Sequence, residues 1–311
     1  MLSIENLHYT YEDGTAALEG INLEIAQGEF LAVLGSNGSG KTTLIKHLNG
    51  LLRPSLGRVL LDGVPLQSLD EGQVFSRIGV VFQDPNDQLF APTVEEDVAF
   101  GPSNMGLCAL EVKERVHEAL HMVGMQDHAR KTIHALSHGQ RKRICLAGVL
   151  AMGPQVMILD EPTAGLDPMG VHHLMHLLED LNKNKGITMI MATHMVDLVP
   201  LFMSRIAILS KGEVLRCGTS EQVFGDPELM KKARLHLPLI AELMNLLKER
   251  DRVNLKHIPL TVGEARREIL RLLSVEDVRA RVLGESEAGR PEGSTAGSET
   301  QDSERETGDE R

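Results

Sequence analysis

A glycine-rich loop between an apolar run and a helical pattern constrains this chain more than any other feature. The run FLAVL predicts a buried strand, the loop GSNGSGKTT follows it at residues 35–43, and LIKHLNG continues with helical spacing. In such a unit the glycines let successive backbone N–H groups point inward, and the helix N-terminus adds the positive end of its dipole. The sequence therefore predicts a phosphate site built into an α/β core.

The loop residues have distinct predicted roles in binding a nucleotide. Lys41 can bridge the β- and γ-phosphates, and the Thr42 hydroxyl can ligate Mg²⁺. The other residues expected around the phosphates are Gly35, Ser36, Asn37, Gly38, Ser39, Gly40 and Thr43. The loop alone does not name a reaction, because GTPases, small-molecule kinases and many ATPases share it.

Two adjacent acids end a second apolar run, VMIL. A carboxylate at the end of a strand, here Asp160, can hold Mg²⁺ through water, and Glu161 can polarise an attacking water. The pair narrows the range of reactions that the phosphate loop permits.

Two further polar residues follow other predicted strands. His194 comes directly after ITMIMAT, and Gln83 ends the run VVF. Because the carboxyl ends of parallel strands meet at one edge of a sheet, we expect His194 near the γ-phosphate. Gln83 can reach Mg²⁺ or the lytic water. Because its amide is neutral, we expect it to sense the state of the site and not to act as a base. The alternative for His194 is a purely structural histidine.

The order of the predicted elements indicates an α/β fold with a mostly parallel sheet, since short apolar runs alternate with helical patterns. GRVLLDGVPLQ resembles a hairpin with Asp62 and Gly63 in the turn, which predicts a small antiparallel layer beside the main sheet. We expect a nucleotide-binding domain over 1–224 with an inserted helical subdomain at about 92–149. A C-terminal helical extension over 225–284 should follow, with a capping pattern at Thr261 and Glu264.

Composition excludes several classes of function. The net charge of −12 argues against a nucleic-acid surface, and we assign the basic triplet Arg141, Lys142 and Arg143 to solvated surface.

Residues 285–311 contain nine acids, three arginines and no large apolar side chain, so we expect them to be disordered. The three cysteines form no CxxC pair, which suits a reducing compartment. No run approaches the roughly 18 apolar residues that span a bilayer, and the N-terminus lacks a signal peptide.

Three histidines in VHHLMHLLEDL have a spacing that could suggest a metal site. His172 and His176 are four residues apart, as metal ligands on one helical face are. The predicted buried stripe consists of Val171, Leu174, Leu178 and Leu181. It leaves the histidines, His173 included, on a solvated face, where we expect no carboxylate or cysteine beside them. We therefore predict no specific metal role.

Taken together, the phosphate loop, Gln83, LSHGQ (residues 136–140), VMILDEP, AGLD and His194 resemble, in this order, the ATP-binding cassette (ABC) ATPases. The resemblance runs from Ile4 to about Gly218 and implies ATP hydrolysis with ATP and Mg²⁺ as ligands. It also implies that Ser137, Gly139 and Gln140 contact the γ-phosphate bound by a second subunit, and that Asp167 contacts that subunit near its phosphate loop.

Two positions need comment within this resemblance. Tyr11 would stack on adenine, and the alternative is a tyrosine in a surface turn. His138 replaces the usual first glycine of LSGGQ. Because only glycine takes positive φ freely, the sequence leaves open which backbone conformation this position adopts. Since one chain carries both a phosphate loop and LSHGQ, two copies arranged head to tail would complete two sites. We expect a homodimer, or a heterodimer with a related ATPase.

Longer segments, such as VFQDPNDQLFAPTVEEDVAFGPSNMGL and GTSEQVFGDPELMKKARLHLPLIAEL, resemble the ATPases of energy-coupling-factor importers, most closely the cobalt and nickel (CbiO) type. This resemblance reaches about Leu273. It implies a peripheral ATPase at the cytoplasmic face of the cell membrane, where ATP-driven dimer closure moves a T-component docked near Gln83. A separate membrane protein would bind the metal ion or vitamin. The alternatives are a vitamin importer, a soluble ABC ATPase without a transport role, and a regulatory module without turnover, although Glu161 and His194 weigh against the last.

Overall fold

The computed structural model describes residues 1–284, with side chains described up to Leu273. Residues 1–265 form one compact unit, and a second unit begins at Arg266. The prediction of disorder for 285–311 concerns residues outside the described range.

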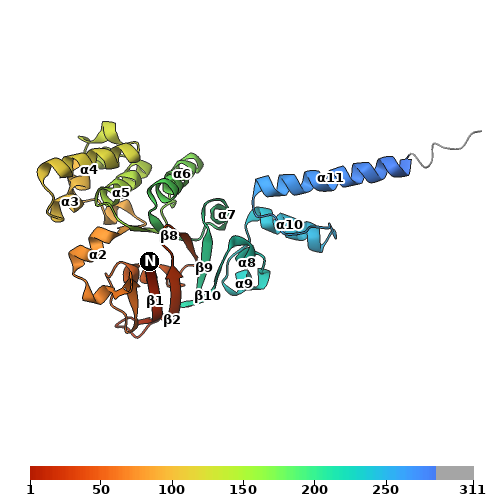
Figure 1. The fold of residues 1–311 in the computed structure, drawn as a ribbon, viewed down its shortest axis with the longest axis horizontal. Helices are drawn as coiled ribbons and strands as arrows, with labels where there is room; N and C mark the ends of the chain where they lie inside the picture. The colour runs from red at the N-terminus through yellow and green to blue at the C-terminus, as the bar shows by residue number, and fades with distance from the viewer. Residues whose placement is uncertain (285–311) are drawn as a thin grey trace, which may run out of the picture. The chain divides into compact units, whose positions relative to one another are not determined.

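A six-stranded, mostly parallel sheet forms the centre of the first unit (Figure 1). The strands lie in the order β10-β9-β3-β8-β7-β6, all neighbours are parallel except β9 and β10, and β3, β7 and β8 are buried along their whole length. The strand bounds are β3 (Phe30–Leu34), β6 (Ile78–Val81), β7 (Val156–Asp160), β8 (Thr188–Thr193), β9 (Arg205–Ser210) and β10 (Glu213–Gly218). Burial on both faces explains why these strands are short uninterrupted apolar runs, and the predicted fold class is confirmed.

A smaller antiparallel sheet with strand order β2-β1-β4-β5 accompanies it. Its strands are β1 (Leu2–Thr10), β2 (Ala16–Ile25), β4 (Leu56–Leu61) and β5 (Val64–Pro65). The turn between β4 and β5 has positive φ at both central residues, 51° at Asp62 and 80° at Gly63, as a type I′ turn requires. The antiparallel layer and its Asp-Gly hairpin turn are thus confirmed.

Strand β3 contributes to two hydrophobic cores and is therefore held from both faces. Leu31 and Val33 join the core that contains β1, β2 and α1 (Lys41–Leu48), whereas Phe30, Ala32 and Leu34 join the core beneath the helices. Because successive side chains of a strand point to opposite faces, five residues suffice to anchor β3 in both. The loop that follows β3 starts from one of the most constrained backbone segments in the molecule.

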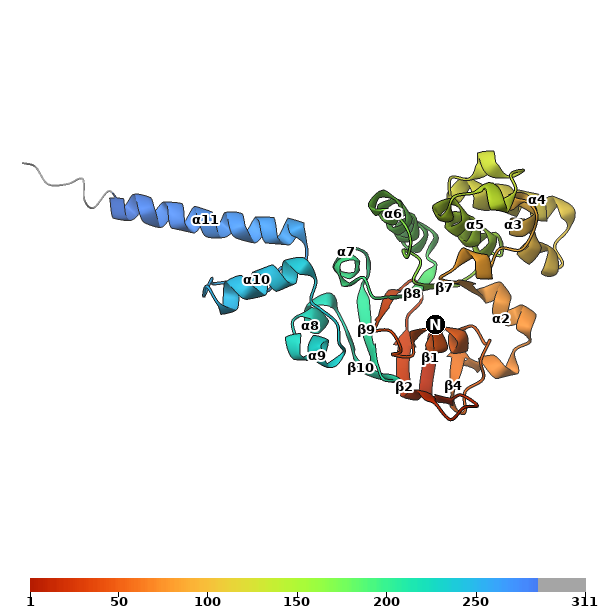
Figure 2. The same cartoon turned by 180° about the vertical axis from the view of Figure 1, so that it is seen from behind.

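Helices α3, α4 and α5 pack against one another, and they stay together in both views (Figures 1 and 2). The helix bounds in this part are α2 (Glu71–Arg77), α3 (Val94–Asn104), α4 (Ala109–Met122), α5 (His138–Ala151), α6 (Pro168–Lys185) and α7 (Val199–Phe202). Short 3₁₀ segments occur at Leu66–Ser68, Pro85–Asp87, Gln126–His128, Ile133–Ala135 and Val196–Leu198. The group α3–α5 occupies the segment for which we expected an inserted helical subdomain.

Four helices follow the last strand: α8 (Ser220–Phe224), α9 (Pro227–Lys232), α10 (Leu239–Glu249) and α11 (Val262–Gly284). The capping pattern before α11 is present, since Thr261 Oγ1 accepts a hydrogen bond from the Glu264 backbone N–H at 3.2 Å. Across the described residues, none of the helices has both the length and the apolar character that crossing a bilayer demands.

Candidate active site

A cavity of about 820 Å³ lies where β3, β7 and β8 end, and it collects residues that are far apart in the sequence. The predicted site residues among those that line it are Tyr11, Asn37, Gly38, Ser39, Gly40, Lys41, Thr42, Thr43, Gln83, Asp160, Glu161 and His194. Gly35 and Ser36 do not line the cavity, but their carbonyl groups accept hydrogen bonds from Lys41. The parallel strands thus bring these groups to one sheet edge, as the sequence analysis expected.

The curled loop between β3 and α1 depends on glycine at two places. Gly40, with φ of 104°, has Ala17 O only 2.8 Å from the position of a Cβ, and a Cβ at Gly35 would collide with Ser39 Oγ and Leu209 O. The loop therefore packs too tightly for side chains at either position. Ser39 Oγ is buried without a hydrogen-bond partner among the described residues, so this hydroxyl suits a phosphate oxygen.

Lys41 is a buried cation surrounded by oxygen atoms. Its Nζ donates to Gly35 O at 2.8 Å and to Ser36 O at 3.3 Å, and it lies 4.0 Å from Glu161 Oε1. Burial lowers the pKa of Lys41, while the charges of Glu161 and Asp160 oppose this effect. The ammonium group is therefore held at the centre of the loop, where a phosphate would enter.

Thr42 and Asp160 present two oxygen groups side by side. Thr42 Oγ1 donates a hydrogen bond to Asp160 Oδ2 at 3.0 Å. Burial raises the pKa of Asp160, an effect that the Thr42 hydrogen bond opposes and the neighbouring Glu161 charge adds to. Oxygen groups of this kind fit Mg²⁺, and the charge of the cation would compensate the unfavourable burial of the carboxylate.

Glu161 leaves the end of β7 with φ of 48°, an uncommon conformation for a residue other than glycine. Its side chain is buried in the cavity, and Oε2 lies 2.9 Å from Nδ1 of the largely exposed His194. The turn is supported from behind by Lys142, whose Nζ donates to Glu161 O at 3.3 Å and to Pro162 O at 2.9 Å. A carboxylate held this firmly at the cavity edge can act on a water beside the γ-phosphate.

The position of Lys142 corrects the sequence analysis, which assigned residues 141–143 to solvated surface. Lys142 is only 4% exposed, and burial lowers its pKa. Three consecutive basic residues gave no sign that one of them points inward, because only the packing of α5 against the turn after β7 decides it. Arg141 is also engaged, donating to Asn86 Oδ1 at 2.7 Å.

Tyr11 stands at the wall of the cavity. Its hydroxyl is hydrogen-bonded to Thr43 Oγ1 at 2.8 Å, and its ring packs edge-on against Tyr9 at 5.0 Å between centroids. Tyr9 in turn packs edge-on against the buried His47, whose Nδ1 is hydrogen-bonded to Thr43 O at 2.8 Å. Tyr11 is therefore anchored to the phosphate loop, and its role toward adenine stays a prediction.

LSHGQ and Asp167 lie apart from the phosphate loop, in a second cavity of about 600 Å³. Ser137 caps α5, since its Oγ accepts from the Gln140 N–H at 3.3 Å, and Asp167 caps α6 by accepting from the Gly170 N–H at 2.6 Å. The cavity thus lies at two helix N-termini, which favour an anion. Within one chain, the structure does not bring Ser137, Gly139, Gln140 or Asp167 to the phosphate loop.

His138 is the first residue of α5 and is not among the residues with positive φ. The question about its backbone is settled, because an ordinary helical residue occupies this position. Its Nε2 would lie only 3.0 Å from a Cβ at Gly165, whose φ is 74°. The imidazole therefore needs the glycine opposite it, a pairing that the sequence did not reveal.

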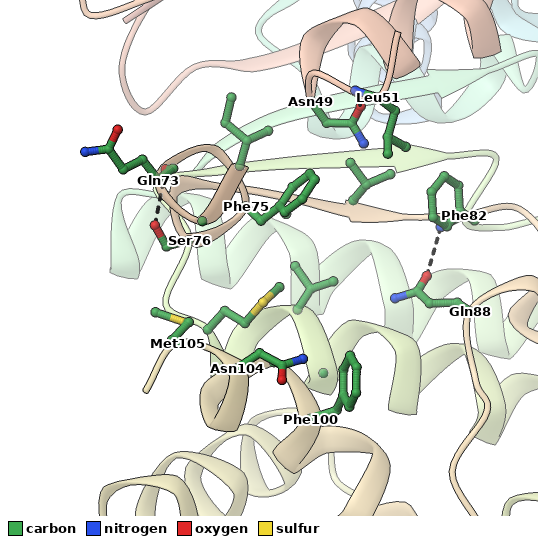
Figure 3. A pocket seen from close by; sticks show the side chains of 18 of the residues that line it. Asn49, Leu51, Gln73, Phe75, Ser76, Phe82, Gln88, Phe100, Asn104 and Met105 are labelled. Carbon is green, nitrogen blue, oxygen red and sulfur yellow. Dashed lines mark hydrogen bonds between the residues drawn. The ribbon is translucent and has the colours of Figure 1, made fainter. Parts of the chain in front are cut away.

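A third cavity, of about 700 Å³, forms a largely apolar groove between α2, α3 and α5 (Figure 3). Phe90 and Phe100 meet edge-to-face at 4.6 Å on it, and they are 64% and 51% exposed. The groove shares one loop with the nucleotide cavity: Gln83 lines the cavity, whereas Phe82 and Gln88 line the groove. The Phe82 N–H donates to Gln88 Oε1 at 3.1 Å, which ties the two ends of this loop together.

The chain is similar in sequence to known ABC transporter ATP-binding proteins. A family model described as ABC transporter matches residues 18–164. A putative ABC transporter ATP-binding protein of Geobacter sulfurreducens is 54% identical over 271 residues, which cover 87% of this chain and 97% of that protein. The energy-coupling factor transporter ATP-binding protein EcfA of Methanocaldococcus jannaschii is 48% identical over 275 residues, 88% of this chain and 98% of that protein.

Solved structures that resemble this chain also belong to ABC ATP-binding proteins. The cbiO1 protein of Clostridium perfringens, described as part of the ABC transporter complex cbiONQ, matches with a TM-score of 0.68 and 48% identity, covering 78% of this chain and 98% of that one. The ATP-binding cassette MJ0796, described as a dimer in a post-hydrolysis state with ADP and Pi, matches with a TM-score of 0.64 and 31% identity over 70% of this chain and 98% of that one.

Proposed function

The chain belongs to the ABC transporter ATP-binding proteins of the energy-coupling-factor type, and we propose that it powers import of cobalt or nickel ions through a membrane T-component. Members of this family hydrolyse ATP with Mg²⁺ and work as dimers with membrane components. The observation that carries the proposal is the loop after β6, which borders both the nucleotide cavity and an exposed apolar groove.

In the proposed reaction, the residues of the phosphate cavity divide the work. The backbone of residues 35–43 and Lys41 would bind the phosphates. Thr42 and Asp160 would hold Mg²⁺, whose chemistry there would be to neutralise charge on the phosphates. Glu161 accepts a proton from the attacking water, and His194, 2.9 Å away, orients the Glu161 carboxylate. Gln83 lines the cavity and lies in the loop that follows β6. Through its amide, a change in the bound nucleotide can alter the position of this loop.

The second half of each site comes from the partner in this proposal. The N-termini of α5 and α6, with Ser137 and Asp167, face the phosphates bound by the other copy, so that each ATP lies between two chains. ATP then stabilises the closed dimer because it contacts both halves only in that state. Hydrolysis removes this differential affinity and reopens the dimer.

The groove is the proposed docking site for the T-component, which places the protein peripherally at the cytoplasmic face of the membrane. Its exposed aromatic side chains and its apolar lining from α2, α3 and α5 suit an amphipathic helix with a bulky apolar face. Movement of the loop from Phe82 to Phe90 would transmit closure of the nucleotide cavity to that helix. The metal-binding or vitamin-binding component is a separate membrane protein.

The assignment of cargo rests on the resemblance of this sequence to the cobalt and nickel type of ATPase. A pull-down of this chain from native membranes in mild detergent, with mass spectrometry of proteins, metals and vitamins, tests it. A small membrane coupling protein together with cobalt or nickel is the expected result. A vitamin in place of the metal would change the cargo, and ribosomal or DNA-repair partners without a membrane protein would overturn the transport role.

A matched pair of variants tests the docking site. Phe100→Asp places a charge in the groove and should abolish co-purification of the membrane component while leaving basal ATP hydrolysis within about threefold. Leu110→Asp is the control, because Leu110 is 66% exposed on α4 and does not line the groove. Equal loss in both variants would show that the groove is not the docking surface.

A further inference from the structure

The outer face of α6 carries a side-chain cluster that the nucleotide chemistry does not use. His172 and His176 are exposed there, as the helical pattern predicted. The prediction that no carboxylate lies beside them is wrong, because Glu179 Oε2 is 3.3 Å from His176 Nδ1. Glu179 is one helical turn beyond His176, so the spacing itself could have suggested this neighbour.

The two imidazoles are hydrogen-bonded to each other. His172 Nε2 and His176 Nε2 are 3.1 Å apart, and the ring centroids are 4.3 Å apart. Two nitrogen ligands about 2.0–2.1 Å from one ion lie about 3.0 Å apart at a right angle and about 3.4 Å apart at a tetrahedral angle. The observed separation falls between these values, so an ion that replaces the shared proton would meet both nitrogens without a large movement of either ring.

The side chains around His176 position its ring for binding an ion. Glu179 Oε2 lies on the Nδ1 side of the His176 ring, so a proton on Nδ1 would face the carboxylate and leave Nε2 as the ligand atom. The carboxylate is itself held by Lys183, whose Nζ lies 2.6 Å from Glu179 Oε1. Phe202 packs edge-on against the His176 ring, with 5.3 Å between centroids.

We propose that His172 and His176 form a surface site for a divalent transition-metal ion, with Glu179 as the positioning residue. Imidazole nitrogen suits Zn²⁺, Ni²⁺, Co²⁺ or Cu²⁺, whereas Mg²⁺ requires oxygen ligands. Among the described side chains, which extend to Leu273, no group of three or more His, Cys, Asp or Glu could hold a metal ion. The proposed site has two protein ligands, so water would supply the others and the bound ion would exchange. It does not depend on the proposed transport function.

His173 provides a matched control within the same helix. It is exposed, adjacent in sequence and chemically identical, but its ring centroid is 6.1 Å from that of His172. It lines the cavity that contains LSHGQ. Loss of His173 removes an imidazole from the same helix without removing either proposed ligand.

The test is calorimetric titration of the full chain, purified without a polyhistidine tag, with Zn²⁺ and separately with Ni²⁺. We expect one site per chain that His172→Ala and His176→Ala each weaken at least about 10-fold. Glu179→Gln should weaken it by up to about 10-fold, as loss of an outer partner of a metal-bound histidine does. His173→Ala should stay within about threefold of the wild type.

Electron paramagnetic resonance of the Cu²⁺-loaded chain adds a readout that a structural role would not change. Two imidazole nitrogens are expected in the wild type and in His173→Ala, and one in His172→Ala. Unchanged affinity in the His172→Ala, His176→Ala double variant would overturn the proposal. So would equal loss in His173→Ala, or the absence of binding in the wild type.

Discussion

The phosphate cavity and the cavity around LSHGQ differ in how their polar groups are satisfied. In the first, polar groups from distant elements meet: Lys41 Nζ lies 4.0 Å from Glu161 Oε1, and Thr42 Oγ1 donates to Asp160 Oδ2. His194 Nδ1 lies 2.9 Å from Glu161 Oε2, which has no hydrogen-bond partner among the described residues. In the second, Ser137 and Asp167 are satisfied locally, as caps of the helices that they begin. One cavity holds reactive groups, and the other offers two helix N-termini.

This difference has an energetic consequence. Hydrogen bonds to charged groups contribute about 1.5–3 kcal/mol each, whereas a charge at an exposed helix N-terminus contributes about 0.3–1 kcal/mol. Changes in the phosphate cavity should therefore affect hydrolysis most. Changes around LSHGQ should act through the partner and have smaller effects within a single chain.

The largest expected effect is that of Glu161→Gln. It should retain ATP binding but lower hydrolysis by about 10²-fold or more, because the amide cannot accept the proton of the attacking water. Steady-state phosphate release and binding of a fluorescent ATP analogue check the two parts. Glu19→Gln is the control, since Glu19 is another carboxylate that lines the same cavity. Wild-type turnover in Glu161→Gln would remove this residue from the catalytic role.

Mixing two inactive variants tests whether the cavities belong to one site across two chains. Lys41→Ala should weaken ATP binding by about 10-fold or more, and Ser137→Ala should impair hydrolysis while each chain still binds ATP. An equimolar mixture should recover roughly a quarter of the wild-type rate, because half of the dimers are mixed and one of their two sites is intact. No recovery would contradict the head-to-tail arrangement.

Asp160→Asn should separate stability from function. Because burial raises the pKa of Asp160, the protonated, neutral carboxyl favours the folded state, and this contribution is lost as the pH rises through the folded pKa and the group ionises. At pH 7 the carboxylate therefore destabilises the chain without nucleotide. Its replacement should raise the free energy of unfolding and weaken Mg²⁺-dependent hydrolysis, by less than Glu161→Gln does.

Chemical denaturation of both proteins at pH 7 and pH 4, without nucleotide or metal, checks this sign. The stability difference should shrink at the lower pH, where the wild-type carboxyl takes up a proton. A variant that is less stable than the wild type at pH 7 would show that Asp160 is held by interactions stronger than its burial penalty.

The smallest expected effect is that of His138→Gly, which restores the usual glycine. Since His138 has ordinary helical backbone, the change should alter hydrolysis by less than about threefold. Gly165→Ala sharpens the comparison, because its Cβ would lie 3.0 Å from the His138 ring on a backbone with φ of 74°. We expect Gly165→Ala to be the more harmful of the two, and to be partly rescued by His138→Gly, measured by steady-state phosphate release.

Much of the phosphate cavity was predictable because its parts follow a local rule. Asp160 ends a buried strand, Glu161 and His194 each come directly after one, and parallel strands deliver their carboxyl ends to one edge. The glycine-rich loop was recognisable from its own residues and the strand before it, although Ala17 and Leu209 from other strands also pack against it. Lys142 was not predictable, since its neighbours in sequence are also basic and only packing turns it toward Glu161 O.

The sequence by itself determined the chemistry: a phosphate loop after β3, acids at the end of β7, a histidine after β8, and a capping pattern at Thr261 and Glu264. These features arise from hydrogen bonds and periodicities among residues close in the chain. Only the tertiary structure decided that Ser137 and Asp167 cap helices beside a separate cavity, that Lys142 is buried and that His172 and His176 are hydrogen-bonded to each other. The direction of a helix terminus and the rotamer of a side chain depend on packing against distant elements, which no local pattern encodes.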